Sequence, residues 1–265
     1  MRVAATKLSQ SVRGWLAEAS NAVASVWFPA GCRLCDVLLV HSSRVPICQE
    51  CLASFAEGPA PICEICGRPQ PSLAPAAETS PLCQVCARNT YGFERVRSYG
   101  VYEGALARAI LLLKWERMDP LAAWFAERLG DLGSALAADV VAPVPLHRKR
   151  QKERGYNQAA LISKPLARRL GLPHQELLLV RTKPRPDKQI LTLDERWASV
   201  RGAFATRPGS QVDKRRVLLV DDVMTTGATL DACARALLSG GAAAVVGLTV
   251  ARAARNPWQP RSDGR

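Results

Sequence analysis

Long hydrophobic runs are missing from this chain of 265 residues: none approaches the roughly 18 residues that a membrane-spanning helix needs. The first residues, MRVAATKLSQSVRGW, lack the apolar core of a signal peptide, so we expect a cytosolic protein. Aromatic residues are scarce at 6%, but 48% hydrophobic and 22% charged residues exclude a disordered chain. The length suits one large domain, or a medium domain with a small module.

Two common nucleotide-binding motifs are also absent. The chain has neither G-x-x-x-x-G-K, the phosphate loop of Walker-type proteins, nor the G-x-G-x-x-G of dinucleotide-binding domains. These two ways of binding a nucleotide are therefore excluded.

Acidic residues are few between Val144 and Arg216, where 18 basic and 6 acidic residues give a net charge of +12. The whole chain has a net charge of +13, so the other 192 residues contribute only about +1. This concentration of positive charge favours anionic partners such as phosphate, pyrophosphate or nucleic acid over a role in solubility alone.

Eight of the nine cysteines form four C-x-x-C pairs, separated by gaps of 12, 11 and 16 residues. Two such pairs can present four thiolates to one ion, which is the pattern of structural zinc sites. We therefore expect two zinc ions and the following ligands: Cys32, Cys35, Cys48, Cys51, Cys63, Cys66, Cys83 and Cys86.

Iron–sulfur clusters and redox dithiols or disulfides are the alternatives for these cysteines, although disulfides do not persist in a chain without an export signal. Pairing in sequence order makes a double zinc ribbon, and a cross-braced arrangement would use the same residues. This short segment has few large apolar residues, so it depends on metal for folding and the metal is structural. His41 is then a surplus loop residue, and Cys233 is a core residue of a later helix.

The rest of the chain divides into a first helix and a region of alternating strands and helices. Apolar residues at spacings of three and four, such as Leu8, Val12 and Trp15, predict an amphipathic helix that packs on the protein rather than on a membrane. After the cysteines, strands alternate with helices and predict an α/β fold, a parallel sheet with helices on both faces. The strands are expected at 96–102, 139–143, 177–180, 217–220 and 243–250. Pro165 should kink or divide the helix at 157–170.

The segment VLLVDDVMTTGATL, from Val217 to Leu230, carries the most specific signal. A buried strand leads into Asp221 and Asp222, then into a threonine-rich turn that opens a helix. Backbone N–H groups at such a helix start suit a phosphate, whereas two carboxylates suit hydroxyls or a magnesium ion held through the substrate. Together these features describe a ribose 5-phosphate.

This segment resembles the phosphoribosyl pyrophosphate (PRPP) signature of type I phosphoribosyltransferases. The segment VPLHRKRQKERGYNQ and the cysteine-rich module in front of it narrow the resemblance to the ComF family, proteins of late competence and DNA uptake. The match extends from about Phe28 to Val250. Tyr156 stands where that family usually has Phe, which should be harmless, and Ser199 stands where we expect Asn.

The resemblance implies a type I phosphoribosyltransferase fold after a double zinc ribbon, and a role for each residue of the site. Asp221 and Asp222 would be the catalytic pair that grips the ribose hydroxyls of PRPP bound with magnesium. The 5′-phosphate cradle would be Thr225, Thr226, Gly227, Ala228 and Thr229, and the pyrophosphate loop Pro145, Leu146, His147 and Arg148. Further substrate-binding candidates are Lys114, Arg154, Asn157, Gln158, Gln189 and Arg196, and residues 181–196 would form a lid.

These expectations give four parts: a helix at 1–30, a double zinc ribbon at 31–90, a phosphoribosyltransferase-like domain at 91–251 and a loose tail at 252–265. Three functions are compatible with them. The first is an enzyme that transfers phosphoribose from PRPP to an acceptor. The second is a factor that handles single-stranded DNA with a helicase or competence partner, using Tyr156, Trp197 and Phe204 as stacking residues. The third is a PRPP-responsive regulator without turnover.

Overall fold

The computed structural model describes residues 31–39, 44–55, 61–70, 82–88, 91–184, 192–210 and 212–253. The chain divides into two compact units, Met1–Phe55 and Ala56–Arg265. The expected helix at 1–30, His41, Gln189 and the tail beyond residue 253 lie outside the described residues. Among the helices that are described, none has the length and apolar character to cross a membrane.

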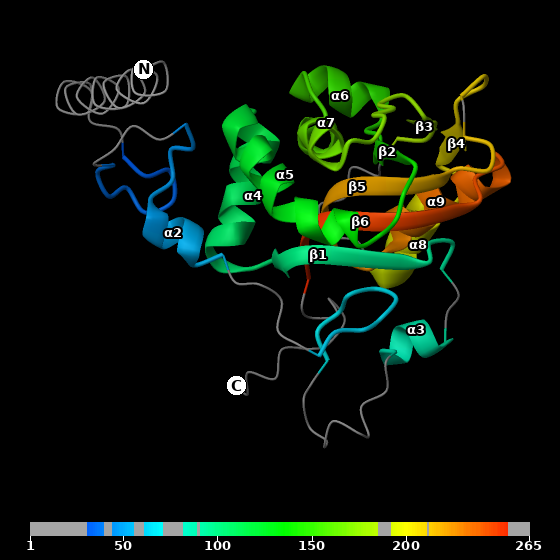
Figure 1. Cartoon of the computed structure of the whole chain (residues 1–265), viewed down its shortest axis with the longest axis horizontal. Helices are drawn as coiled ribbons and strands as arrows, with labels where there is room; N and C mark the ends of the chain where they lie inside the picture. Colours follow the sequence, from blue (N-terminus) through cyan, green and yellow to red (C-terminus); the bar gives the residue numbers. More distant parts are fainter. Residues whose placement is uncertain are drawn as a thin grey trace, which may run out of the picture. The chain divides into compact units, whose positions relative to one another are not determined.

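A four-stranded parallel sheet forms the centre of the larger unit, with strand order β1-β6-β5-β2 (Figure 1). Each of its two middle strands contains a buried apolar run, residues 217–220 in β5 and 244–248 in β6, because both faces of the sheet are covered. The bounds are Arg95–Val101 for β1, Val140–Pro143 for β2, Arg216–Met224 for β5 and Ala244–Arg252 for β6. The predicted α/β fold is confirmed.

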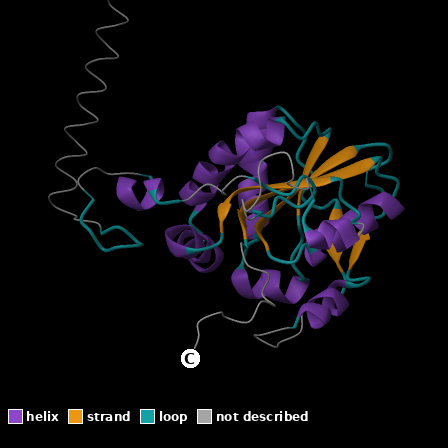
Figure 2. Cartoon of the chain, turned by 90° about the horizontal axis from the view of Figure 1, so that it is seen from below, coloured by secondary structure: helices purple, strands orange, loops and turns teal. Residues whose placement is uncertain are grey.

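Helices cover both faces of this sheet (Figure 2). Three of them contact one face: α4 (Gly104–Glu116), α5 (Asp119–Ser134) and α7 (Gln158–Leu170). The other face is covered by α9 (Ala228–Ser239), against which α8 (Leu193–Val200) packs. The short helix α6 (Arg148–Arg154) follows β2 and precedes α7.

The structure differs from the expectations at three points. Of the two effects expected of Pro165, a kink or a division, the division is absent: α7 runs unbroken because Ile162 and Leu166 are fully buried and hold the helix on the sheet and on α5. The strand expected at 177–180 lies at Leu179–Arg181 as β3, where it pairs antiparallel with β4 (Phe204–Thr206) in a separate two-stranded sheet. Leu177 itself is 58% exposed.

The third difference concerns strand ends. β5 does not stop before the two acids but continues through Asp221 and Asp222 to Met224, paired with β6. Arg252, which we assigned to the loose tail, is instead the last residue of β6 and only 1% exposed.

The face under α9 contains an apolar core that includes Cys233, as predicted, together with Leu219 and Leu237. The second group of four cysteines, with the helix α3 (Gln84–Arg88), belongs to this same core. The first group, with the helix α2 (Gln49–Ala53), belongs to the smaller unit. Tyr156 and Phe204, which we offered as stacking residues for DNA, are both buried.

Candidate functional site

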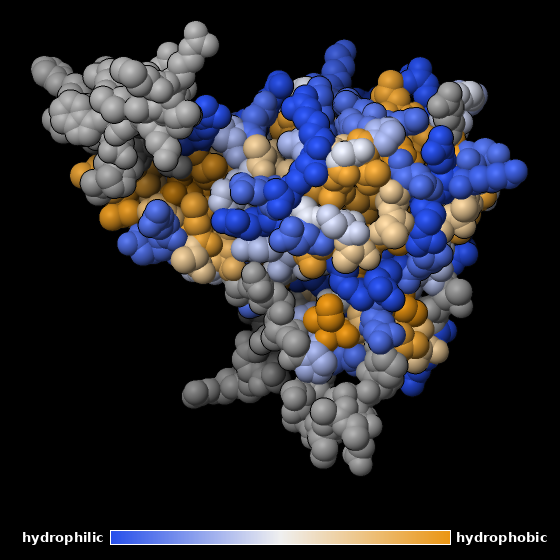
Figure 3. Space-filling view, in the orientation of Figure 1, coloured by the Kyte–Doolittle hydropathy of each residue, from blue (hydrophilic) through white to orange (hydrophobic). Residues whose placement is uncertain are grey.

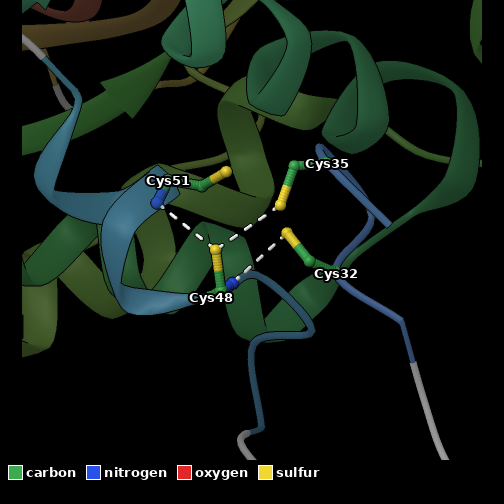
Figure 4. Close-up of side chains that lie close together, drawn as sticks. All are labelled: Cys32, Cys35, Cys48 and Cys51. Carbon is green, nitrogen blue, oxygen red and sulfur yellow. Dashed lines mark hydrogen bonds between the residues drawn. The ribbon is translucent and has the colours of Figure 1, made fainter. Parts of the chain in front are cut away.

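The first four cysteines converge on one point within the smaller unit. Cys32 and Cys35 lie on a tight turn, Cys48 is the N-cap of α2 and Cys51 lies inside that helix. Their sulfurs point toward one another (Figure 4). The N–H group of Cys48 donates to the Cys32 sulfur at 3.3 Å, and that of Cys51 donates to the Cys48 sulfur at 3.4 Å.

The second four cysteines repeat this arrangement in the larger unit and are buried throughout. Cys63 and Cys66 lie on a turn, and Cys83 precedes α3, which contains Cys86. The N–H group of Cys83 donates to the Cys63 sulfur at 3.4 Å, the counterpart of the bond from Cys48 to Cys32.

Both groups have the dimensions of a tetrahedral metal site. A zinc–sulfur distance of about 2.3 Å places two ligand sulfurs about 3.8 Å apart. The Sγ atoms of Cys35 and Cys48 are 3.7 Å apart, and so are those of Cys66 and Cys83. Within each group all sulfurs lie within 4.8 Å of one another, so the pairs combine in sequence order and are not cross-braced.

Backbone N–H groups favour the thiolate form that a metal requires. Burial raises the pKa of Cys32, but N–H groups of Cys48, Leu34 and Cys35 directed at its sulfur lower the pKa to about 6. In the same way, burial raises the pKa of Cys63 and backbone N–H groups lower it to about 7. Donors of this kind hold a ligand in its metal-binding form.

The expected phosphate cradle, residues 225–229, forms the turn between β5 and α9 and is called the phosphate turn below. Gly227 is the N-cap of α9 and adopts a left-handed conformation with φ +88°. Another residue would be strained by this φ, and its Cβ atom would lie 2.8 Å from the flexible end of the Met224 side chain. The Thr226 hydroxyl accepts a hydrogen bond from the N–H of Ala228 at 3.2 Å, and Thr229 lies in the first turn of α9.

The two acids precede this turn and face opposite sides of the sheet, because successive strand residues alternate. Asp222 is 4% exposed, and its Oδ2 lies 3.0 Å from Nζ of Lys114, on the last turn of α4. Asp221 is half-buried on the α9 side; burial raises the pKa of Cys233 on that helix, and the charge of Asp221 adds to the effect. The structure thus brings Lys114 and Asp222 together from distant parts of the chain.

The expected pyrophosphate loop follows β2, the neighbour of β5 in the sheet. Parallel strands end at the same edge, so this loop lies beside the acids. Pro145 is buried, Leu146 and His147 are half-buried, and Arg148 is exposed. The Nδ1 atom of His147 caps α6 by accepting from the N–H of Lys149 at 3.3 Å.

Arg196 reaches the cradle from α8, where its guanidinium donates to the Thr225 hydroxyl at 3.2 Å. The helix α8 is fixed by a capping box in which Thr192 and Glu195 bond to each other's backbone. The structure therefore places Arg196 beside the residues that the sequence assigned to phosphate binding.

The segment RGYNQ mainly supports other elements. The Asn157 side chain caps α7 and donates to the carbonyl of Val144 at 3.0 Å, which fixes the loop after β2. Gln158 is buried and accepts from Arg154 at 2.6 Å. Burial lowers the pKa of Arg154, and the nearby charge of Asp222 opposes that effect. Of these three residues, Arg154 is the one whose charge interacts with Asp222.

Sequence reasoning missed three residues of this region. Arg252 is buried under the phosphate turn, Tyr91 donates from its hydroxyl to the Thr226 carbonyl at 3.4 Å, and Trp115 is exposed beside Lys114. The apolar run GLTVAR gives no sign that its last residue is a buried cation. Trp115 had a signal, since it follows three leucines and Lys114 at the end of a helix.

The chain is similar to a known protein family and to several known proteins. The family model "Phosphoribosyl transferase domain" matches residues 157–264. The chain is 31% identical to DNA utilization protein YhgH of Salmonella typhimurium, covering 82% of this chain and 94% of that protein. It is 28% identical to Competence protein ComFC of Bacillus subtilis, covering 81% and 91%. A solved adenine phosphoribosyltransferase from Thermoanaerobacter pseudethanolicus is 17% identical, covers 52% of this chain and 83% of that one, and has a TM-score of 0.34.

Proposed function

The chain belongs to the ComF family of phosphoribosyltransferase-like proteins, and we propose that it binds PRPP with Mg²⁺ where β5 meets α9. The observation that carries the proposal is the cradle at Gly227, which follows two acids on a buried strand. The N–H groups at the start of α9 would bind the 5′-phosphate, helped by the helix dipole. Asp221 and Asp222 would accept hydrogen bonds from the ribose hydroxyls.

Three elements supply cations for the proposed site. Lys114 on α4 would stay paired with Asp222 and hold that carboxylate in its orientation. Arg148 after β2 and Arg196 on α8 would offset the charge of the pyrophosphate. Magnesium, when bound with PRPP, would neutralise pyrophosphate oxygens and assist their departure.

Calorimetric titration with PRPP and Mg²⁺ tests this site. Wild-type protein should bind, and the double variant Asp221→Ala/Asp222→Ala should not. Asp119→Ala is the matched control, because Asp119 is an exposed acid paired only with the exposed Arg117 among the described residues. Equal binding by the double variant and the control would contradict the assignment.

Transfer and sensing differ in one measurable step. In transfer, the acceptor forms a bond to C1 of the phosphoribose while the bond from C1 to pyrophosphate breaks, and pyrophosphate leaves with the electron pair. A sensor binds PRPP without that step. Pyrophosphate release, assayed in the presence of candidate acceptors, therefore separates the two.

We also propose that both cysteine groups hold zinc. Four sulfurs occupy all four positions of each tetrahedron, so the ion would be structural. Metal analysis should find about two zinc ions per chain, and a chelator should release them. Iron in the purified protein would contradict this proposal.

Binding of single-stranded DNA is a second candidate, favoured by Trp115. Its side chain is 69% exposed, and the Arg154 guanidinium lies 5.0 Å from its ring centroid. Hydrophilic side chains predominate over α6 (Figure 3). This helix supplies five cations: Arg148, Lys149, Arg150, Lys152 and Arg154. A stacking ring beside a cationic strip suits a single strand, and the names of the relatives mention DNA utilization and competence.

Fluorescence anisotropy with an oligothymidine tests this second function. Affinity should fall steeply with salt, and Trp115→Ala should weaken binding at least about fivefold. Leu177→Ala is the control, because Leu177 is a similarly exposed apolar residue outside α4 and α6. A salt-independent affinity would refute binding through the cations of α6. Equal effects of the two variants would refute the role of Trp115.

A further inference from the structure

Arg252 is a buried cation that bridges two sites of the larger unit. Its side chain lies below the turn after β5 and above the turn of Cys63 and Cys66, and the residue is only 1% exposed. A buried guanidinium is costly unless its donors are satisfied. We therefore expect Arg252 to hold in place the groups that accept its hydrogen bonds.

On one side Arg252 binds the phosphate turn. One terminal nitrogen donates to the carbonyl of Met224 at 3.0 Å and also to the carbonyl of Thr225. In a trans peptide, the carbonyl and the following N–H point in opposite directions. Drawing these two carbonyls toward Arg252 therefore turns the N–H groups of Thr225 and Thr226 away from it.

On the other side Arg252 binds the second cysteine group. Its Nε donates to the carbonyl of Cys66 at 3.2 Å, and another terminal nitrogen lies 3.9 Å from the Cys66 sulfur. The same turn is fixed to the sheet, because the N–H of Val96 donates to the carbonyl of Ile65 at 2.7 Å. The position of the Cys66 carbonyl thus depends on how the turn of Cys63 and Cys66 is held.

We propose that Arg252 couples metal binding at the second cysteine group to PRPP binding. This inference rests on the proposed PRPP site and adds a positioning residue that would not touch the ligand. With metal bound, the turn holds the Cys66 carbonyl where Arg252 can bridge it to the phosphate turn. Without metal the turn keeps its bond to Val96 but Cys66 is no longer held, so the bridge weakens and the N–H groups of Thr225 and Thr226 lose their common orientation.

Thermodynamic linkage requires the effect to be reciprocal. If metal at the second group strengthens PRPP binding, then PRPP must strengthen the retention of that metal. The first cysteine group belongs to the other compact unit, and Arg252 bridges to the second group. We therefore expect PRPP to protect one of the two metal ions.

The first experiment follows zinc release from the full-length wild-type protein after addition of a chelator. PRPP with Mg²⁺ should slow one of two release phases at least about threefold and leave the other unchanged. Cys35→Ser, which removes a ligand of the first group, should lack the phase that PRPP does not affect. Equal slowing of both phases, or of neither, would overturn the coupling.

The second experiment measures PRPP affinity of Arg252→Met and Arg252→Lys together with their zinc content. Arg252→Met keeps the apolar bulk, and the four sulfurs remain, so about two zinc ions should be retained. Its dissociation constant for PRPP should rise at least about tenfold, because charged hydrogen bonds that hold the turn are lost. Arg216→Met is the control for loss of a partly exposed arginine that bonds elsewhere.

The outcomes separate this inference from the function on which it rests. If the wild-type protein does not bind PRPP, the proposed function fails and the coupling fails with it. If it binds PRPP but Arg252→Met and Arg252→Lys bind equally well, the coupling alone is overturned. The release experiment uses wild-type protein for its main result, so it decides the question even if a substitution at Arg252 prevents folding.

Discussion

The hydroxyl of Tyr156 should contribute measurably to stability, although the resemblance to the ComF family led us to expect that Phe would serve equally well there. The hydroxyl donates to the carbonyl of Leu113 at 2.8 Å and accepts from the N–H of Arg117 at 2.9 Å. Arg117 ends α4 in a left-handed conformation with φ +47°. Lys114 lies in that last turn, so the same hydroxyl helps to position a residue of the candidate site.

The magnitude follows from the two bonds. Tyr156→Phe removes both and leaves a carbonyl and an N–H without that partner, at about 1 kcal/mol each, so the free energy of unfolding should fall by about 2 kcal/mol. With a urea slope of about 2 kcal/mol per molar, the midpoint should fall by about 1 M. Urea unfolding with zinc in excess, followed by circular dichroism, measures this shift.

The control for this prediction is Tyr102→Phe. Tyr102 is half-buried, and its hydroxyl has no hydrogen bond among the described residues. Its midpoint should stay within about 0.3 M of wild type. If Tyr156→Phe shifts no further than Tyr102→Phe, the hydroxyl does not secure the end of α4, and our account of how Lys114 is positioned is refuted.

Two further predictions concern the phosphate turn and a histidine. Gly227→Ala should lower the free energy of unfolding by about 1–2 kcal/mol and weaken PRPP binding, because φ is +88° and the added Cβ would contact Met224. Urea unfolding measures the first effect and calorimetry the second. Burial lowers the pKa of His174, as do Lys164 and Arg168, while Glu176 opposes them. Neutral His174 therefore makes its full contribution to the free energy of unfolding above about pH 6.5. This contribution is lost as the pH falls through the lowered pKa. His174→Gln should remove that part of the pH dependence of unfolding, and an unchanged pH profile would contradict it.

The sequence predicted the parallel sheet because strands alternate with helices after the cysteines. It predicted the β5 to α9 turn because acids, threonines and Gly227 occur there in a fixed order. It could not predict β3 correctly, since Leu177 is as apolar as its neighbours yet exposed, and only pairing with β4 sets the register. The continuity of α7 through Pro165 was equally hidden, because packing of Ile162 and Leu166 outweighs the missing N–H.

Buried polar contacts between distant segments were the hardest to predict. Lys114 and Asp222 are far apart in the chain, and only the fold brings Nζ within 3.0 Å of the carboxylate. Arg252 was assigned to a polar tail because the residues from Arg255 onward are mostly polar. The carbonyl groups that accept its hydrogen bonds lie on two turns from separate parts of the chain. No local sequence pattern shows that these turns meet.

The two cysteine groups have the same C-x-x-C spacing, yet the fold gives them different surroundings. Cys35 in the first group is exposed, whereas all four cysteines of the second lie in the apolar core that also contains Phe93 and Cys233. The C-x-x-C motif specifies the geometry of a metal site, but burial determines which other groups that site can influence. Metal at the second group is therefore expected to stabilise the core and the phosphate turn together, while metal at the first would stabilise its own unit.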